Sequence, residues 1–128
     1  MSGDSSEMAH PKFRIWLRPD GIAQCVWASG VATTLEDAIA STSALVELTG
    51  GRRVPLLVEP GEAATQDRAA RLEFARQAEN VSALALIVHS PLSRIMGNLF
   101  ANVHQAVAPT QLFDDEDSAV AWLKQFTA

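Results

Sequence analysis

The sequence has little of the chemistry from which most catalytic sites are built. Its 128 residues include one cysteine, three histidines and no tyrosine. Because a single cysteine cannot form an intrachain disulfide, we expect a reducing compartment, the cytoplasm. Cys25 lies in a run of apolar residues, which is typical of an inert buried thiol. The histidines are scattered and give no metal-ligand spacing, so we expect neither a metal nor another cofactor.

Basic charge is also scarce. Ten Lys and Arg residues against fifteen Asp and Glu residues give a formal net charge of −5 and a pI near 5.0. Nucleic-acid binding needs a basic surface, so this balance argues against it. No apolar run reaches the length of a membrane span, and the polar start "MSGDSSEMAHPK" has no signal-peptide core. We therefore expect no nucleic-acid partner and no integral membrane association.

Short catalytic motifs are missing as well. The chain has no Gly-x-Ser-x-Gly elbow, no Walker loop and no Gly-x-Gly-x-x-Gly dinucleotide motif. The acidic run "DDED" at 114–117 lacks the loop glycine of a calcium site and is typical of helix capping. We therefore expect a protein that is not an enzyme.

What the chain does contain is the pattern of one globular domain, with 48% apolar and 20% charged residues. Residues 1–11 are polar and end at Pro11, which predicts a disordered tail before a single domain at 12–128. The stretch "KFRIWLRPDGIAQCVWA" (12–28) alternates apolar and polar residues on both sides of "RPDG". Pro19 and Gly21 suit a tight turn there, so the stretch predicts an antiparallel hairpin.

After the hairpin, strands alternate with helices. Thr34 and Asp37 form a capping box, and Gly50-Gly51 ends the helix that it starts. The apolar residues of this helix recur at helical spacing: Leu35, Ala38, Ile39, Leu45 and Val46. The later elements are a strand at 54–59, a helix from a Thr65 cap to about Ala78, a strand at 83–89, a helix starting at Ser90-Pro91, a strand at 109–113 and a helix capped by Asp114 or Asp115. The order β-β-α-β-α-β-α-β-α predicts an α/β fold, a mixed sheet with parallel central strands.

Three segments in this order carry a family resemblance: "RRVPLLVE", "ALALIVHSPLSRIMGN" and "PTQLFDDEDSAVAWL". With the element order, they make the chain resemble the SpoIIAA-like fold of STAS domains and CRAL-TRIO lipid-transfer domains over residues 12–126. More narrowly, the chain is similar to small bacterial proteins described as STAS/SEC14-like. The resemblance implies the fold directly and a regulatory role through protein interaction.

The resemblance also implies where a phosphoserine switch would lie. Anti-sigma-factor antagonists of this fold place the serine in an Asp-Ser-Ser-Gly helix start after a strand that ends in Asp. Here Glu59 ends the strand and Asp67 stands near the loop Asp, but the two serines are replaced by Arg68 and Ala69. Thr65 is the nearest hydroxyl, and an N-cap role accounts for it. We therefore expect a STAS-like module without the family phosphoserine.

The junction "HSPLSRIMGN" (89–98) is a candidate anion site. A helix N-terminus carries partial positive charge and unpaired N–H groups, which suit a phosphate or a carboxylate. A ligand at this strand end would meet side chains that can donate hydrogen bonds: His89, Ser90, Ser93, Arg94 and Asn98. The alternative is that Ser90 and Pro91 only start the helix.

Two further groups are candidate interfaces. Gly97 and Ala101 form a small-residue ridge that would allow another helix to approach closely, as a dimer contact or as the floor of a ligand site. Trp16 and Trp27 are expected on the hairpin face opposite Phe13 or near its rim, where a helix of the same chain or a second subunit could cover them. Two hypotheses follow: a homo-oligomeric protein-interaction module, or a protein that binds a small anionic ligand or a lipid headgroup.

Overall fold

The hairpin forms as its alternation predicts. In the computed structural model, which describes residues 7–61, 65–91, 94–95, 97–98, 101 and 107–127, β2 (Phe13–Leu17) pairs antiparallel with β3 (Ala23–Trp27). Gly21 takes a φ of 89°, and the carboxylate of Asp20 accepts a hydrogen bond from the Ile22 N–H at 3.2 Å. Since side chains alternate across a strand, Ile15 and its partner Cys25 face the core on one side of the sheet.

The prediction of a disordered tail is wrong for part of residues 1–11. Glu7–Ala9 form β1, an edge strand that pairs antiparallel with β2 and places Met8 opposite Ile15. Met8 packs against the core cluster that contains Ile15. Three residues, with Met8 and Ala9 both apolar, give no alternation from which a strand could be predicted, so the tertiary contact decides this strand.

The main sheet has six strands in the order β1-β2-β3-β5-β7-β8, and β3, β5, β7 and β8 are parallel. Its later strands are β5 (Val54–Glu59), β7 (Val81–Ile87) and β8 (Thr110–Phe113). This confirms the predicted mixed sheet with parallel central strands. The strand at 83–89 begins two residues earlier and ends two residues earlier than predicted.

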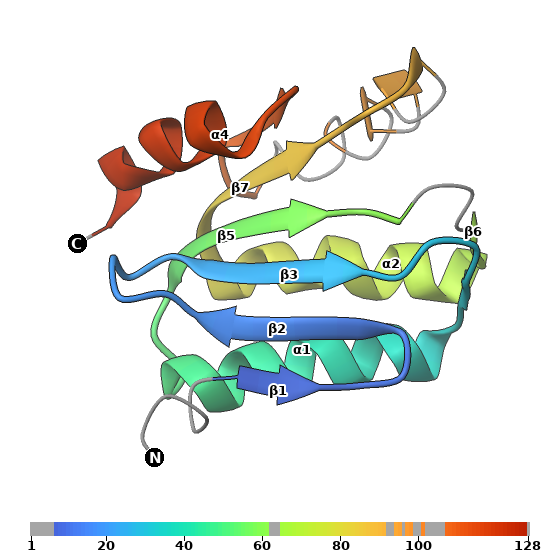
Figure 1. The fold of residues 1–128 in the computed structure, drawn as a ribbon. Coiled ribbons are helices and arrows are strands. Elements are labelled where there is room, and N and C mark those ends of the chain that lie inside the picture. Colours follow the sequence, from blue (N-terminus) through green and yellow to red (C-terminus); the bar gives the residue numbers. More distant parts are fainter. Residues whose placement is uncertain are drawn as a thin grey trace.

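Helices cover both faces of the sheet (Figure 1). On one face α1 (Leu35–Thr49) and α2 (Arg68–Gln77) lie side by side. On the other face α4 (Glu116–Leu123) packs on Ile22, Leu57 and Ala85 through Ala119 and Leu123. Two short 3₁₀ turns follow helices: η2 (Ala78–Asn80) and η3 (Lys124–Phe126).

A second, two-stranded sheet holds the beginnings of α1 and α2 together. β4 (Ala32–Thr33) pairs in parallel with β6 (Thr65–Gln66), and the Thr65 N–H donates to the Val31 carbonyl at 3.0 Å. The expected N-cap role of Thr65 is therefore wrong, because Thr65 is in a strand. Asp67 caps α2 instead, and its carboxylate accepts the Ala70 N–H at 2.8 Å.

The other predicted helix ends are confirmed. Thr34 and Asp37 form the capping box of α1, and Gly50 closes that helix in the left-handed conformation with a φ of 67°. Asp115 caps α4. The described residues between Pro91 and Ala101 have helical backbone. Within the part of the chain that the structure describes, no helix is both long and apolar enough to cross a bilayer.

Candidate functional site

The carboxyl ends of the parallel strands meet at one edge of the sheet. Glu59 ends β5, and His89 follows β7 by two residues. The His89 Nε2 lies 3.2 Å from a Glu59 carboxylate oxygen, although the two residues are 30 positions apart in the chain. Open α/β sheets bind ligands at this edge, so it is the first place to look for a site.

A cavity of about 460 Å³ lies at this edge. Its walls come from the end of β7, the start of the following helix and the end of β8: Val88, His89, Ser90, Pro91, Arg94 and Asp114. Three of the residues predicted for the anion site, His89, Ser90 and Arg94, are thus brought together. Asn98 is exposed on the same helix but does not line the cavity, and Ser93 lies outside the described residues.

The charge of this cavity is mixed. Arg94 forms an ion pair with Asp114, so its guanidinium already has a carboxylate partner. Glu59 places a second carboxylate beside His89. The first turns of this helix carry no acidic residue of their own, and Asp114 provides the negative charge from the end of β8. From the sequence, Asp114 is predicted only as a helix cap, since nothing local relates it to Arg94 twenty positions earlier.

The two tryptophans lie on different faces of the hairpin. Trp27 is paired with Phe13 in the sheet register and packs inward, with ring centroids 4.8 Å from Phe13 and 5.7 Å from Phe74. Its expected position opposite Phe13 is therefore wrong, because directly paired residues share a face. Trp16 is on the opposite face, half-buried, with the Arg14 guanidinium 5.3 Å from its ring.

The small-residue ridge is directed at the protein's own sheet. A Cβ at Gly97 would lie 3.0 Å from a Leu112 methyl and 3.2 Å from a Val88 methyl. Gly97 thus lets its helix approach β8 and the end of β7 closely. Ala101 is half-buried on the same helix.

Cys25 has the environment expected of an inert thiol. It is only 3% exposed, and burial raises its pKa to about 12, so it is protonated at neutral pH. Among the described residues, no three His, Cys, Asp or Glu side chains are grouped so that they could hold a metal ion.

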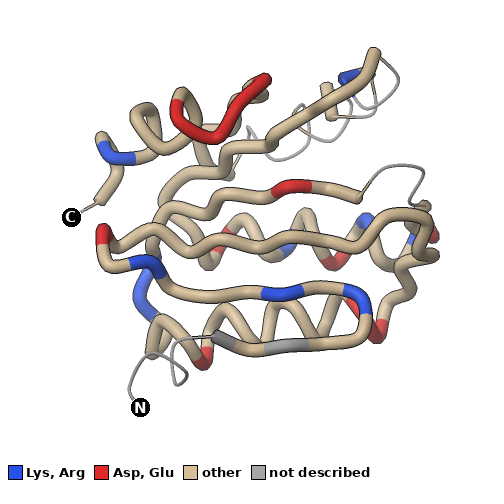
Figure 2. Tube along the Cα trace, in the orientation of Figure 1, with Lys and Arg blue, Asp and Glu red and all other residues tan. Residues whose placement is uncertain are grey.

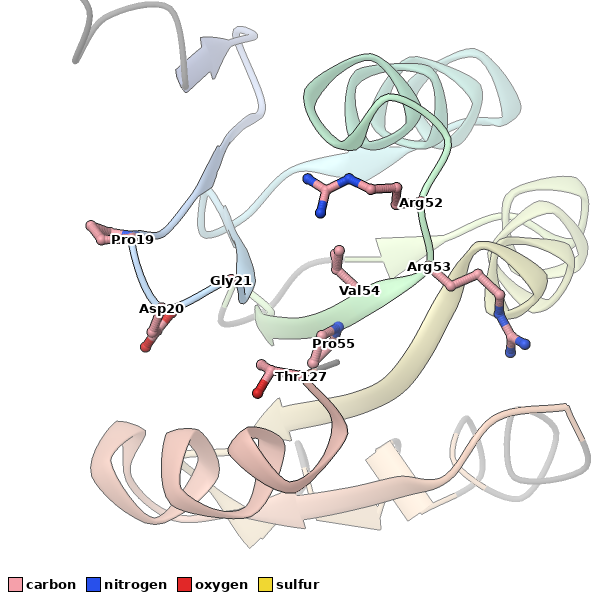
Figure 3. A pocket seen from close by; sticks show the side chains of 8 residues that line it. All are labelled: Pro19, Asp20, Gly21, Arg52, Arg53, Val54, Pro55 and Thr127. Atoms are coloured by element: carbon pink, nitrogen blue, oxygen red, sulfur yellow. The ribbon is translucent and has the colours of Figure 1, made fainter.

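A second cavity of about 460 Å³ lies at the opposite end of the sheet, near the hairpin turn and the start of β5 (Figure 3). Arg52 and Arg53 line it, but their side chains point to opposite sides (Figure 3). Arg52 donates to the Thr49 carbonyl at 3.0 Å, and Arg53 donates to the Val81 carbonyl at 2.9 Å. These two cations therefore do not converge on a common ligand.

An apolar surface on the outside of α1 and α2 is the feature that the sequence analysis missed. Leu35, Ile39 and Val46 are spaced i, i+4 and i+11 along α1 and are 39–44% exposed. Leu72 of α2 is 56% exposed. The sequence shows that α1 has apolar residues at helical spacing. Only the packing shows that Ala38 and Leu45 are buried, whereas the three residues of the apolar row are exposed.

The pairing of β4 with β6 fixes how far along its axis each residue of α1 lies relative to the residues of α2. Ala32 pairs with Thr65 and Thr33 with Gln66, an offset of 33 positions. Because both helices begin directly after these strands and rise 1.5 Å per residue, Ile39 lies at the height of Leu72. Ala38, which packs with Ala70 and Phe74 of α2, is the neighbour of Ile39 in sequence. The apolar row of α1 therefore borders the line where the two helices meet. We call Leu35, Ile39, Val46 and Leu72 the interaction face.

The sheet order, the helices on both faces and the parallel strand ends define an α/β protein with a SpoIIAA-like fold, as the sequence resemblance implied. The chain belongs to the family described as "Domain of unknown function (DUF7793)", whose model matches residues 15–127.

A solved structure agrees with this fold. A protein of the DUF3478 family with a SpoIIAA-like fold, from Shewanella loihica PV-4, matches 91% of this chain and 98% of its own at a TM-score of 0.66 and 16% identity. A protein with unknown function from Arthrobacter sp. FB24 is 30% identical over 85% of this chain and 90% of its own, at a TM-score of 0.31. A comparison with curated proteins finds no match.

Proposed function

We propose that this protein is a non-enzymatic regulatory module of the cytoplasm that binds a protein partner through the interaction face. The observation that supports this proposal is the exposed apolar row on α1, together with exposed Leu72 on the neighbouring helix α2. Single exposed apolar residues are common on protein surfaces and need no explanation. A row of large aliphatic side chains at helical spacing on two adjacent helices is instead typical of a surface that a partner covers.

Asp67 supports a module that works without the family phosphoserine. In the phosphorylated relatives, the added charge lies at the start of the helix that corresponds to α2. Here the Asp67 carboxylate already accepts the Ala70 N–H at this position, so a fixed negative charge is present. The proposed interaction is therefore constitutive, with no phosphate needed at this helix.

The test is affinity capture with the tagged full-length chain in lysate of the producing organism. Ile39→Asp and Leu72→Asp place charges in the interaction face, and Ile95→Asp is the matched control because Ile95 is 58% exposed on a different helix. We expect a stoichiometric protein, the untagged chain included, to be retained by the wild type and by Ile95→Asp but lost from the other two variants. Retention that is equal for all four proteins would contradict the proposal.

The cavity lined by His89, Ser90 and Arg94 favours a second candidate function, the binding of a phosphate-bearing ligand such as a lipid headgroup. Arg94 would have to exchange Asp114 for the ligand, so the carboxylate competes with an anion. Asp114→Asn should therefore strengthen binding of inorganic phosphate, and Arg94→Ala should abolish it, as measured by isothermal titration. If no variant binds phosphate or headgroup-bearing vesicles, this candidate is wrong.

A further inference from the structure

We propose that the interaction face binds a second copy of this chain, in a two-fold dimer whose axis runs parallel to α1 and α2. This inference rests on the proposed function, since it identifies the partner of the same surface.

The first argument is the distribution of charge over the two helices (Figure 2). α1 has acidic residues and no basic one; Asp37 is buried, and Glu36 and Glu47 are exposed. α2 is basic in balance, with one acidic residue, Glu73, and three exposed arginines: Arg68, Arg71 and Arg76. Glu73 is already paired with Arg76 at 3.1 Å. The face thus joins an acidic helix to a basic one.

The second argument is where these charges lie around each helix. The buried residues fix which side of each helix faces the sheet, and each further residue turns by about 100°. Glu36 and Glu47 then fall on the side of the apolar row that is away from α2. Arg68 and Arg71 fall on the side of Leu72 that is away from α1. Around the first turns of the two helices, the order across the surface is therefore acidic, apolar, basic. Arg76, four residues after Leu72, turns toward α1 instead, and its charge is paired with Glu73.

This order is self-complementary for one arrangement of two copies. Rotation about an axis parallel to the helices puts α1 of one copy over α2 of the other, so acidic residues meet basic ones and the apolar rows meet each other. The heights agree, because the strand register places Glu36 level with Ala69, between Arg68 and Arg71. A two-fold axis that lies in the surface but perpendicular to the helices would instead put α1 of one copy over α1 of the other. Glu36 and Glu47 would then face the acidic residues of the second copy, which is unfavourable.

The experiment is sedimentation of the purified full-length chain over a range of micromolar concentrations. We expect a species of twice the 13.8 kDa chain mass for the wild type and for Ile95→Asp, and monomers for Ile39→Asp and Leu72→Asp. Circular dichroism checks that the variants fold. A wild-type monomer throughout the range, or a dimer that survives both variants, would overturn the proposal.

Charge reversal tests the identity of the partner. Glu36→Arg and Arg68→Glu should each raise the dissociation constant of the dimer about tenfold. In a two-fold dimer each contact occurs twice, so a single substitution alters both copies of it. The double variant restores opposite charges only if Glu36 meets Arg68 of an identical chain, so it should recover most of the wild-type affinity. A double variant as weak as the singles would overturn the two-fold arrangement.

The capture experiment separates this inference from the proposed function. Suppose that the wild type sediments as a monomer and captures a protein that the Leu72→Asp variant does not capture. The partner is then a different protein, and only the proposed dimer is wrong. If the wild type neither sediments as a dimer nor retains any protein, both are wrong.

Discussion

Asp37 has the most demanding environment of the described charged residues. Its residue surface is only 7% exposed, and its carboxylate accepts hydrogen bonds from the Lys12 ammonium at 2.7 Å, the Thr34 N–H at 2.9 Å and the Thr34 hydroxyl at 3.0 Å. Lys12 also donates to the Ala32 carbonyl at 2.8 Å. One carboxylate thus joins the start of the hairpin, β4 and the first turn of α1.

These contacts make part of the stability depend on pH. Burial alone would raise the pKa of Asp37, but the hydrogen bonds from Lys12 and Thr34 and the Lys12 charge outweigh it, so the pKa lies below its ordinary 3.8. The contribution is then present above about pH 4 and is lost as the pH falls through the lower, folded pKa. Asp37→Asn should cost about 2 kcal/mol of unfolding free energy at pH 6, measured in urea. The gap to the wild type should shrink below pH 4, and a gap that stays constant down to pH 3 would contradict this assignment.

Gly61 is required by the close approach of a loop that is distant in the sequence, the one at Ala28 and Ser29. A Cβ at this position would lie 2.0 Å from the Ala28 carbonyl oxygen, so the two strand-end loops touch through their backbones. Gly61→Ala should cost about 1–3 kcal/mol, because the backbone must move. The comparison is Gly30→Ala, which meets no atom within 4 Å and loses only about 1 kcal/mol to its positive φ. Equal losses in thermal unfolding would show that the loops separate easily.

At the scale of elements, the first turn of α2 is the clearest case. The sequence predicts Thr65 as the cap of this helix, but the structure has Asp67 there, because Thr65 pairs in β6. Asp67→Ala should therefore lose about 1 kcal/mol in urea unfolding, and Asp67→Ser should recover most of it. Thr65→Ala is the control, since its side chain is exposed and makes no capping bond; a larger loss there would reverse the assignment.

Long elements could be predicted from the sequence for a physical reason. α1 has a capping box at one end and a left-handed glycine at the other, and β5 is a bounded apolar run, so both were located from local signals. β4 and β6 have two residues each, too few to show a period of two. The outward direction of Ile39 could not be predicted either, because α1 has more apolar positions than the sheet and α2 together can cover.

The candidate site, too, could be predicted from the sequence only in part. The position of His89, Ser90 and Arg94 at a strand end followed from the chain order, and all three line the same cavity. Their partners could not be predicted, because Glu59 and Asp114 reach them through the sheet from 30 and 20 positions away. Local sequence patterns carry no information about such pairings.

At the scale of the whole molecule, one polar cluster connects the two ends of the chain. Gln24 of β3 is 6% exposed; its side-chain carbonyl accepts from Arg18 at 3.0 Å, and its amide donates to the Glu116 carboxylate at 3.1 Å. Arg18 also pairs with Asp20 at 3.1 Å and lies 3.5 Å from Glu116. Because Gln24 is buried, losing Glu116 leaves an amide without its acceptor, which costs more than an exposed bond.

Glu116→Ala should therefore destabilise the molecule by about 1–2 kcal/mol in urea unfolding. Asp117→Ala is the matched control, since both acids lie in the first turn of α4 and favour that helix end equally. The Asp117 side chain is exposed and has no hydrogen bond or ion pair to any part of the chain that the structure describes, so its loss should cost only a few tenths of a kcal/mol. Equal losses would mean that Glu116 acts only on its own helix. A larger loss for Glu116 means that α4 and the hairpin unfold as one cooperative unit, held at this contact as well as by the apolar core beneath α4.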